Sequence, residues 1–184
     1  MRALIIYHAN CADGFTAAWI AESVLSQDMD VELYPANYGE SAPIDLITKD
    51  TKVYILDFSY PWEQMLAICD AANRHVILLD HHKSALERLA NFDHPNLIKV
   101  LDMDCSGAGL TWRWFFPNKT MPPLVQRVQD RDLWRFQYAD SKEVSEAIFS
   151  RPYTLEAWDE MAAMDIEDLA YEGAAIKRKK DKDI

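Results

Sequence analysis

The sequence predicts an α/β fold, with a mostly parallel five-stranded sheet, helices on both of its faces and a helical C-terminal segment. Two patterns support this prediction. Up to Phe116, short apolar runs rich in β-branched residues alternate with segments whose apolar residues recur at helical spacing. From about Pro122 onward the helical spacing continues and no further strand-like run occurs. Alternation of strands and helices is typical of an open parallel sheet covered on both sides.

The individual elements follow from these patterns. The expected strands are the apolar runs 2–8, 31–37, 52–58, 75–82 and 96–102. The expected helices between them are 13–27, 61–73, 84–92 and 106–116, followed by helical runs at 122–134, 141–149, 154–164 and 166–183. Asp13 suits the cap of the first helix, and Pro61 suits the first turn of the second. We therefore expect an α/β catalytic domain over 1–136 and a helical extension over 137–184 that packs on it.

Composition restricts the function. The formal net charge of −11 argues against a protein that coats long nucleic acid, which needs a basic surface. We find neither an apolar run of about 18 residues nor a secretory signal pattern, so we expect no membrane span or export. Three widely spaced cysteines, Cys11, Cys69 and Cys105, fit free thiols better than a disulfide framework. Free thiols favour a reducing compartment, and we expect a cytoplasmic protein.

Acidic residues and histidines gather where the expected strands end. They are His8, Cys11 and Asp13 after the first strand, Asp57 after the third, Asp80, His81 and His82 at the fourth, and Asp102 and Asp104 after the fifth. Open parallel sheets bind ligands at the carboxyl ends of their strands. Carboxylates and imidazoles are ligands for divalent cations, and a cation pair about 3.5–4 Å apart suits the hydrolysis of phosphate esters.

Four short motifs give a specific resemblance. They are CADG at 11–14, YILDF at 54–58, DHH at 80–82 and DRDLWRF at 130–136. In this combination and order the chain, over about residues 2–136, resembles the DHH phosphoesterase superfamily. That superfamily contains RecJ-type exonucleases, oligoribonucleases, cyclic-dinucleotide phosphodiesterases and family II inorganic pyrophosphatases.

The resemblance implies two metal ions and assigns their ligands. One ion would be held by Asp13, Asp57, His81 and Asp130. The second would be held by His8, Cys11 and the bridging Asp57. Asp80 would orient an imidazole and His82 would face the phosphate or leaving group, which makes both catalytic residues. Mn²⁺ is the expected metal, with Mg²⁺, Fe²⁺ and Zn²⁺ as alternatives.

Two departures from the family pattern stand out. Cys11 occupies a position that is usually Asp, in a loop one residue shorter than in many members, as in DHH-like sequences with an N-C-x-D-G turn. Its thiolate would ligate, would lie beside the site as a small apolar group, or would leave that metal weakly bound. The usual C-terminal substrate domain, with its glycine-rich motif, has no counterpart here. Substrate would then be covered by the helical tail, by a second copy in a homo-oligomer, or scarcely at all.

Three further residues are candidates for substrate binding. Ser106 and Gly107 open an expected helix, whose backbone N–H groups suit an anion, although an ordinary serine cap explains them equally well. Arg131 follows the fourth-motif Asp and would meet a phosphate or form a surface ion pair. Most of the six tryptophans are expected in the core, with Trp112, Trp114 and Trp134 as alternatives for base stacking beside arginines.

We therefore expect a metal-dependent phosphoesterase that hydrolyses phosphodiester bonds in short oligonucleotides or nucleotides by a two-metal mechanism. The alternatives are a pyrophosphatase or nucleotide phosphatase, and a DHH-like binding or regulatory module with a weakened site. The phosphodiester reading is preferred because the second domain that would grip pyrophosphate is missing.

Overall fold

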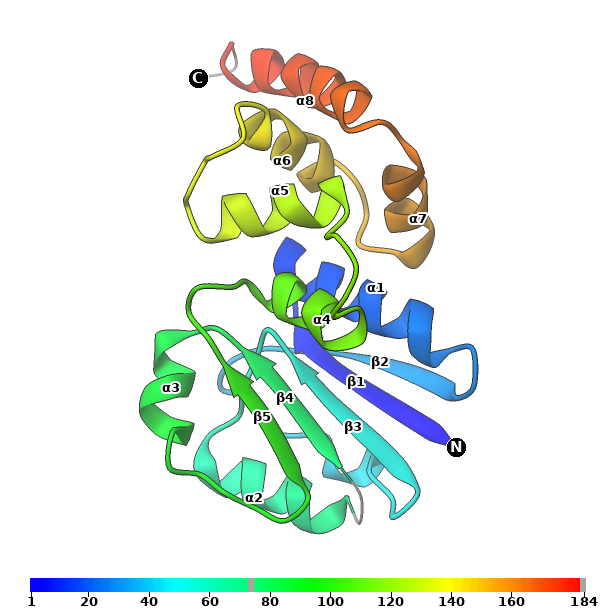
Figure 1. Ribbon diagram of the computed structural model, residues 1–184, viewed down its shortest axis with the longest axis vertical. Coiled ribbons are helices and arrows are strands. Elements are labelled where there is room, and N and C mark those ends of the chain that lie inside the picture. Colours follow the sequence, from blue (N-terminus) through cyan, green and yellow to red (C-terminus); the bar gives the residue numbers. More distant parts are fainter. Residues whose placement is uncertain (73–74, 183–184) are drawn as a thin grey trace.

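The computed structural model describes residues 1–72 and 75–182 and confirms the α/β fold (Figure 1). Its five strands form one entirely parallel sheet in the order β2-β1-β3-β4-β5. The strands are β1 (Arg2–His8), β2 (Asp30–Ala36), β3 (Thr51–Leu56), β4 (Val76–Asp80) and β5 (Leu97–Leu101). The helices are α1 (Ala12–Leu25), α2 (Trp62–Ala71), α3 (Lys83–Leu89), α4 (Gly107–Phe115), α5 (Pro123–Asp132), α6 (Ser141–Phe149), α7 (Leu155–Ala163) and α8 (Ile166–Lys180), with a short 3₁₀ turn, η1 (Ile44–Leu46).

Strands β2 and β5 end one residue earlier than the sequence predicts, and β3 and β4 end two residues earlier. Strand β3 ends at Leu56, because Asp57 turns the chain out of the sheet with a φ of 55°. Strand β4 ends at Asp80, so both following histidines lie in the connection to α3. These ends place polar side chains just beyond the last paired residues. The predicted helix ends at Asn73 and Asp183 lie outside the described residues.

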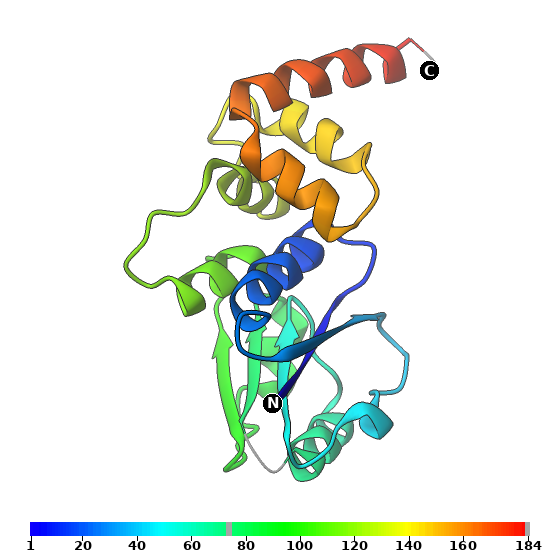
Figure 2. The ribbon, with the colours of Figure 1, turned by 90° about the vertical axis from the view of Figure 1, so that its right-hand side faces the viewer.

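The sheet is covered on both faces (Figures 1 and 2). Side chains of a strand point alternately to the two faces. In strand β1, Ile5 and Tyr7 pack toward α1 and α4, whereas Leu4 and Ile6 pack toward α2, α3 and η1. Burial on both faces explains why the strands read as continuous apolar runs.

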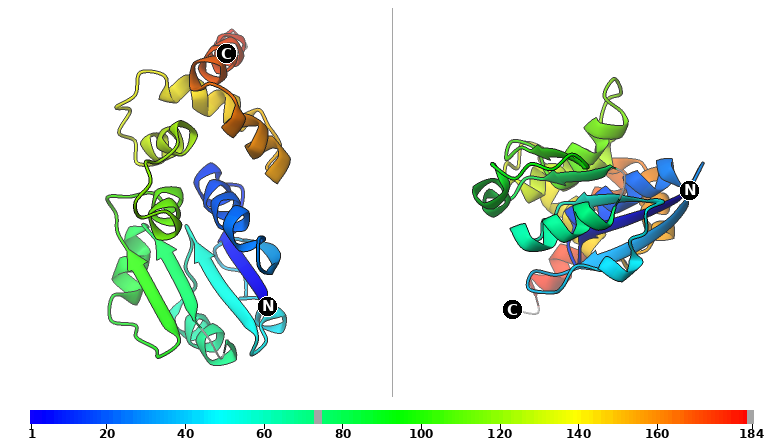
Figure 3. Two further views of the ribbon diagram at one scale, coloured as in Figure 1. Left: turned by 45° about the vertical axis from the view of Figure 1, so that its right-hand side comes forward. Right: turned by 90° about the horizontal axis from the view of Figure 1, so that it is seen from below.

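The C-terminal helices α5 to α8 stand above α1 and α4, at the end of the sheet where its strands finish (Figure 3, left). Trp158 of α7 is fully buried, contacts Phe15 of α1 and donates a 2.9 Å hydrogen bond from Nε1 to Oγ1 of Thr16. One hydrophobic cluster continues from the sheet through α1 and α4 into these helices. The expected boundary near Phe136 falls in the connection between α5 and α6, which pack against each other.

Two expectations from composition can be compared with the structure. All three cysteines are free thiols, as predicted. Among the residues described, no helix has the length and apolar character required to cross a membrane.

Candidate metal centre

The carboxylate of Asp57 lies between two imidazoles. Its Oδ1 is 3.1 Å from Nε2 of His81, and its Oδ2 is 3.6 Å from Nδ1 of His8. The three side chains come from the ends of β3, β4 and β1, which are adjacent strands. The parallel sheet therefore brings together residues that are far apart in the chain, as the sequence predicted.

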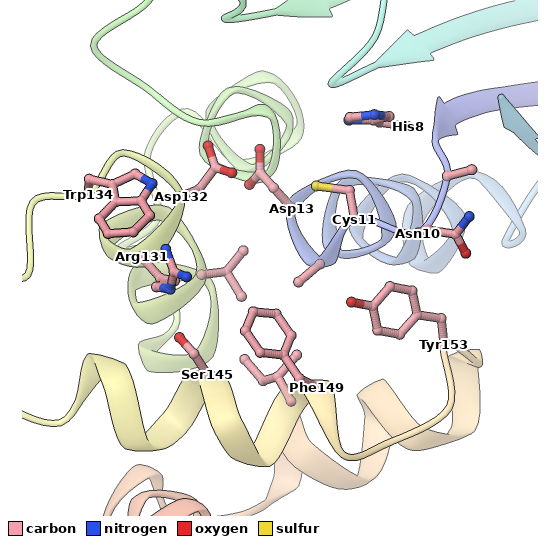
Figure 4. A pocket seen from close by; sticks show the side chains of 14 residues that line it. His8, Asn10, Cys11, Asp13, Arg131, Asp132, Trp134, Ser145, Phe149 and Tyr153 are labelled. Carbon is pink, nitrogen blue, oxygen red and sulfur yellow. The ribbon is translucent and has the colours of Figure 1, made fainter. Parts of the chain in front are cut away.

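Three sets of donor atoms surround this carboxylate. Within each set, one donor atom per residue lies within 4.8 Å of the others: His8, Cys11 and Asp57; Asp57, His81 and His82; and Asp13, His81 and Asp132. The sets overlap through Asp57 and His81, so they form one continuous cluster. Cys11 and Asp13 belong to the start of α1, and their side chains line the same pocket as His8 (Figure 4).

Asp13 is fixed by the N-terminus of α4. Its Oδ2 accepts a 2.6 Å hydrogen bond from the backbone N–H of Gly107, and its Oδ1 accepts a 3.0 Å hydrogen bond from that of Ala108. Ser106 caps the same helix, because its Oγ accepts a hydrogen bond from the N–H of Gly109. The expectation that Ser106 and Gly107 bind substrate is thus corrected: these N–H groups already bind a carboxylate of the protein itself.

Gly107 also allows the N-terminus of α4 to approach Asp57 and Asp13 closely. A Cβ atom on Gly107 would overlap the side chain of Asp57 and lie 2.9 Å from Oδ2 of Asp13. The absence of a side chain therefore lets α4 reach both carboxylates. Sequence reasoning noticed this glycine but not its role, since its two neighbours are 50 and 94 residues away in the chain.

Helix α5 supplies Asp132 to the cluster of donor atoms. This corrects the expectation that the ligand from this segment is Asp130. Oδ2 of Asp132 is 3.3 Å from Nε2 of His81. Asp130 instead accepts hydrogen bonds from the backbone N–H groups of Gln137 and Tyr138 and from Oγ of Ser141. Residues two apart on a helix point about 200° away from each other, so the two carboxylates cannot face the same site.

Asp80 and His82 form a separate pair at the edge of the cluster. Oδ1 of Asp80 is 2.7 Å from Nδ1 of His82 and also accepts the backbone N–H of His82 at 3.1 Å. This fully buried carboxylate fixes the orientation of the imidazole, which is the arrangement expected from the sequence. The ring of His82 lies next to that of His81, with centroids 4.5 Å apart.

Charge is concentrated in this cluster. Burial alone would raise the pKa of Asp57, but the imidazoles of His8 and His81 outweigh it and lower the pKa to about 2. Burial, with repulsion from Asp57 and Asp132, raises the pKa of Asp13 well above its usual value. Burial lowers the pKa of His81, but Asp57, Asp13 and Asp132 outweigh it and raise the pKa to about 9. Such a set of carboxylates needs positive charge among them.

The donor set fits divalent cations. Within the described part of the chain, both oxygens of Asp57, Nδ1 of His8 and Oδ2 of Asp132 are buried and have no hydrogen-bond partner. Buried polar atoms are nearly always paired, so unpaired ones gathered in one cluster of donor atoms are suited to hold ligands. Carboxylate oxygens with imidazole nitrogens suit Mn²⁺, Fe²⁺ or Zn²⁺, and a thiolate shifts the preference toward Zn²⁺ or Fe²⁺.

Comparisons with known proteins support the fold only. No family model matches the chain. An uncharacterized protein of Acanthamoeba polyphaga mimivirus is 28% identical over an alignment of 178 positions that covers 91% of this chain and 42% of that protein. The crystal structure of an uncharacterized protein from Helicobacter pylori has a TM-score of 0.68 and 17% identity, covering 98% of this chain and 62% of that one. The chain thus spans less than two thirds of the length of either protein.

Proposed function

We propose that this protein is a metal-dependent phosphoesterase that hydrolyses phosphodiester bonds in short oligonucleotides or nucleotides. The observation that carries the proposal is Asp57, whose two unpaired oxygens face different imidazoles on either side. A buried carboxylate in this position is suited to bridge two cations. The resemblance of residues 2–136 to the DHH superfamily supports the same reaction class.

The ligands divide into two sets around Asp57. One cation would be held by Asp13, Asp57, His81 and Asp132. The other would be held by His8, Cys11 and Asp57. When bound, the cations would neutralise the negative charge that develops on the phosphoryl oxygens. Mn²⁺ is the proposed metal, because most of the ligands are carboxylates, and Fe²⁺ or Zn²⁺ is the alternative at the site that includes Cys11.

The protein itself supplies a proton donor. The hydrogen bond to Asp80, partly opposed by burial, raises the pKa of His82, which favours the protonated imidazole. Because Nδ1 is directed at Asp80, Nε2 is the nitrogen left for substrate. We propose that His82 donates its Nε2 proton to the leaving oxygen as a general acid, while Asp80 keeps the ring oriented.

Charge favours short substrates. A formal net charge of −11 repels a long phosphate backbone, whereas a short ester adds only a few charges. Three free thiols are compatible with a reducing compartment, so we propose a cytoplasmic protein.

A substrate panel with Mn²⁺ tests the proposal. Rates are compared for a dinucleotide, a long single strand at equal concentration of ends, a cyclic dinucleotide and pyrophosphate. We expect the dinucleotide to be cleaved faster than the long strand and His81→Ala to abolish this activity. His75→Ala, which removes an exposed histidine away from the site, is the matched control. Turnover of pyrophosphate alone would favour a pyrophosphatase, and no turnover of any ester would contradict the proposal.

A further inference from the structure

Two cavities adjoin the candidate metal centre. The first, of about 380 Å³, is lined by Cys11, Asp13, Arg131, Phe149 and Tyr153, among others (Figure 4). Because metal donors line it, this cavity belongs to the site already described. The second, of about 350 Å³, is lined by residues that follow β2 and β3 and by residues of α2 and α3. None of the residues proposed as metal ligands lines the second cavity, so it is a separate feature of the fold.

Two aromatic rings form a wall between the second cavity and the metal centre. The ring centroid of Tyr38, in the connection after β2, is 5.2 Å from that of His8 and 6.0 Å from that of His82. The ring of Phe58, which follows β3, packs on Tyr38 with centroids 4.8 Å apart. Both rings also line the second cavity. The cavity therefore has an aromatic side toward the metal centre.

Helix α3 supplies a cation to the second cavity. Ser84 and Arg88 both line it and lie about one turn apart, on the same face of α3. Lys83 of the same helix is paired with Glu87, whereas Arg88 forms no ion pair with a carboxylate of the described residues. The guanidinium of Arg88 therefore remains available to an anion.

Polar groups also reach the second cavity from the connection after β3. Ser59 is only 7% exposed, although it lines the cavity. Tyr60 lines it too, and its buried hydroxyl has no hydrogen-bond partner among the described residues. Buried polar groups are nearly always paired, so an unpaired hydroxyl beside a cavity favours a ligand there.

One carboxylate, that of Glu40, lines the second cavity as well. Its Oε2 accepts a hydrogen bond of 3.2 Å from the backbone N–H of Asn37, and its Oε1 accepts one of 3.1 Å from Nδ2 of the same residue. Both oxygens of Glu40 thus bind within the turn that follows β2. They are directed at Asn37, which leaves the positive charge of Arg88 for a ligand.

We propose that the second cavity is a binding site, apart from the metal centre, for the phosphate group of a small organic monoester. Arg88 binds the phosphate oxygens, and the hydroxyls of Ser59 and Ser84 donate to them from other directions. A guanidinium alone can satisfy the two oxygens of a carboxylate, whereas the three terminal oxygens of a phosphate ester use further donors. Free phosphate leaves the rings of Tyr38 and Phe58 uncovered, so an ester with an apolar organic group fits better.

Binding to the full chain, freed of metal by a chelator, tests this inference apart from catalysis and from phosphate bound to metal. Phenyl phosphate, inorganic phosphate and benzoate are titrated by calorimetry. We expect phenyl phosphate to bind at least about tenfold more tightly than benzoate, and more tightly than inorganic phosphate. Arg88→Gln, at an exposed position, should lower the affinity for phenyl phosphate at least about tenfold. Arg178→Gln, which removes an exposed arginine of α8, is the matched control and should bind as wild type.

His81→Ala separates the second cavity from the metal centre, because it removes an imidazole of the centre. Wild-type affinity for phenyl phosphate in His81→Ala, with the loss expected in Arg88→Gln, would support the separate site. Loss in His81→Ala with wild-type affinity in Arg88→Gln would place the phosphate among the metal donors and overturn the inference. Equal affinity for benzoate, or no binding of phenyl phosphate, would also overturn it. Equal affinity for inorganic phosphate would overturn the organic ester and leave free phosphate as the ligand. No turnover enters these titrations, so failure of the proposed phosphoesterase function would not change their outcome.

Discussion

The backbone N–H of Gly107 donates a hydrogen bond of 2.6 Å to Oδ2 of Asp13, a residue 94 positions earlier in the chain. The N-terminus of α4 thereby fixes a carboxylate carried by α1. The same carboxylate is 3.8 Å from Nε2 of His81. Helix α4 is therefore a positioning element of the candidate metal centre.

Gly107→Ala should weaken metal binding while the protein still folds. The added Cβ would push α4 away from Asp57 and Asp13. Loss of a group that orients a ligand typically lowers metal affinity by about 10- to 100-fold. Calorimetric titration with Mn²⁺ measures the change. Gly39→Ala is the control, since a Cβ there meets open space and strains only the backbone at a φ of 90°. Equal Mn²⁺ affinity in Gly107→Ala and wild type would show that α4 does not position the ligands.

Asp132→Asn and Asp130→Asn should have different effects. Asp132→Asn should lower the affinity for one cation by at least about tenfold and abolish hydrolysis, because it removes an unpaired ligand oxygen. Asp130→Asn should keep both cations but lower the free energy of unfolding by about 1–3 kcal/mol, because it weakens charged hydrogen bonds to Gln137, Tyr138 and Ser141. Metal titration and urea unfolding of both variants separate the roles, and the opposite pattern would restore Asp130 as the ligand.

This pair also illustrates what the sequence could and could not predict. That His8, Asp57 and Asp80 lie at one edge of the sheet was predictable, because the strand-like runs and their parallel order bring the carboxyl ends of the strands together. The choice between Asp130 and Asp132 was not, because it depends on the rotation of α5 about its axis. An error of about half a turn in helix phase exchanges the two faces, and both residues fit a motif written as DRD.

The role of the α4 N-terminus could likewise not be predicted from the sequence. The sequence indicated an anion site at Ser106 and Gly107, and the structure contains one. The anion is Asp13 of α1, and no local pattern relates residues so far apart. The cavity that Cys11 shares with Phe149 and Tyr153 could not be predicted either. These residues are far apart in the sequence, and only the tertiary fold brings them together.

Variants of Cys11 test whether its thiol is a ligand of the cation proposed to bind His8 and Asp57. Burial and the negative charges of Asp57 and Asp13 raise the pKa of its thiol, so without a cation the thiol stays protonated. If Cys11 is a ligand, Cys11→Asp should raise Mn²⁺ affinity and Cys11→Ala should weaken only the cation held with His8. Bound metal should also slow alkylation of the thiol, and Cys69 and Cys105 are buried and should react later. Unchanged titrations in Cys11→Ala, with no protection by metal, would mean that the thiol only lies beside the site.

The most direct test of the central claim is the number of Mn²⁺ ions that bind to Asp57→Asn. Wild-type protein freed of metal by a chelator should bind two ions in a calorimetric titration, and saturation should raise its melting temperature. Asp57→Asn should remain folded, since asparagine has nearly the size and shape of aspartate, and the melting curve of the metal-free variant checks this. It should lose both high-affinity sites, because both cations depend on the one carboxylate. Two sites of wild-type affinity in folded Asp57→Asn protein would contradict the bridged two-metal centre.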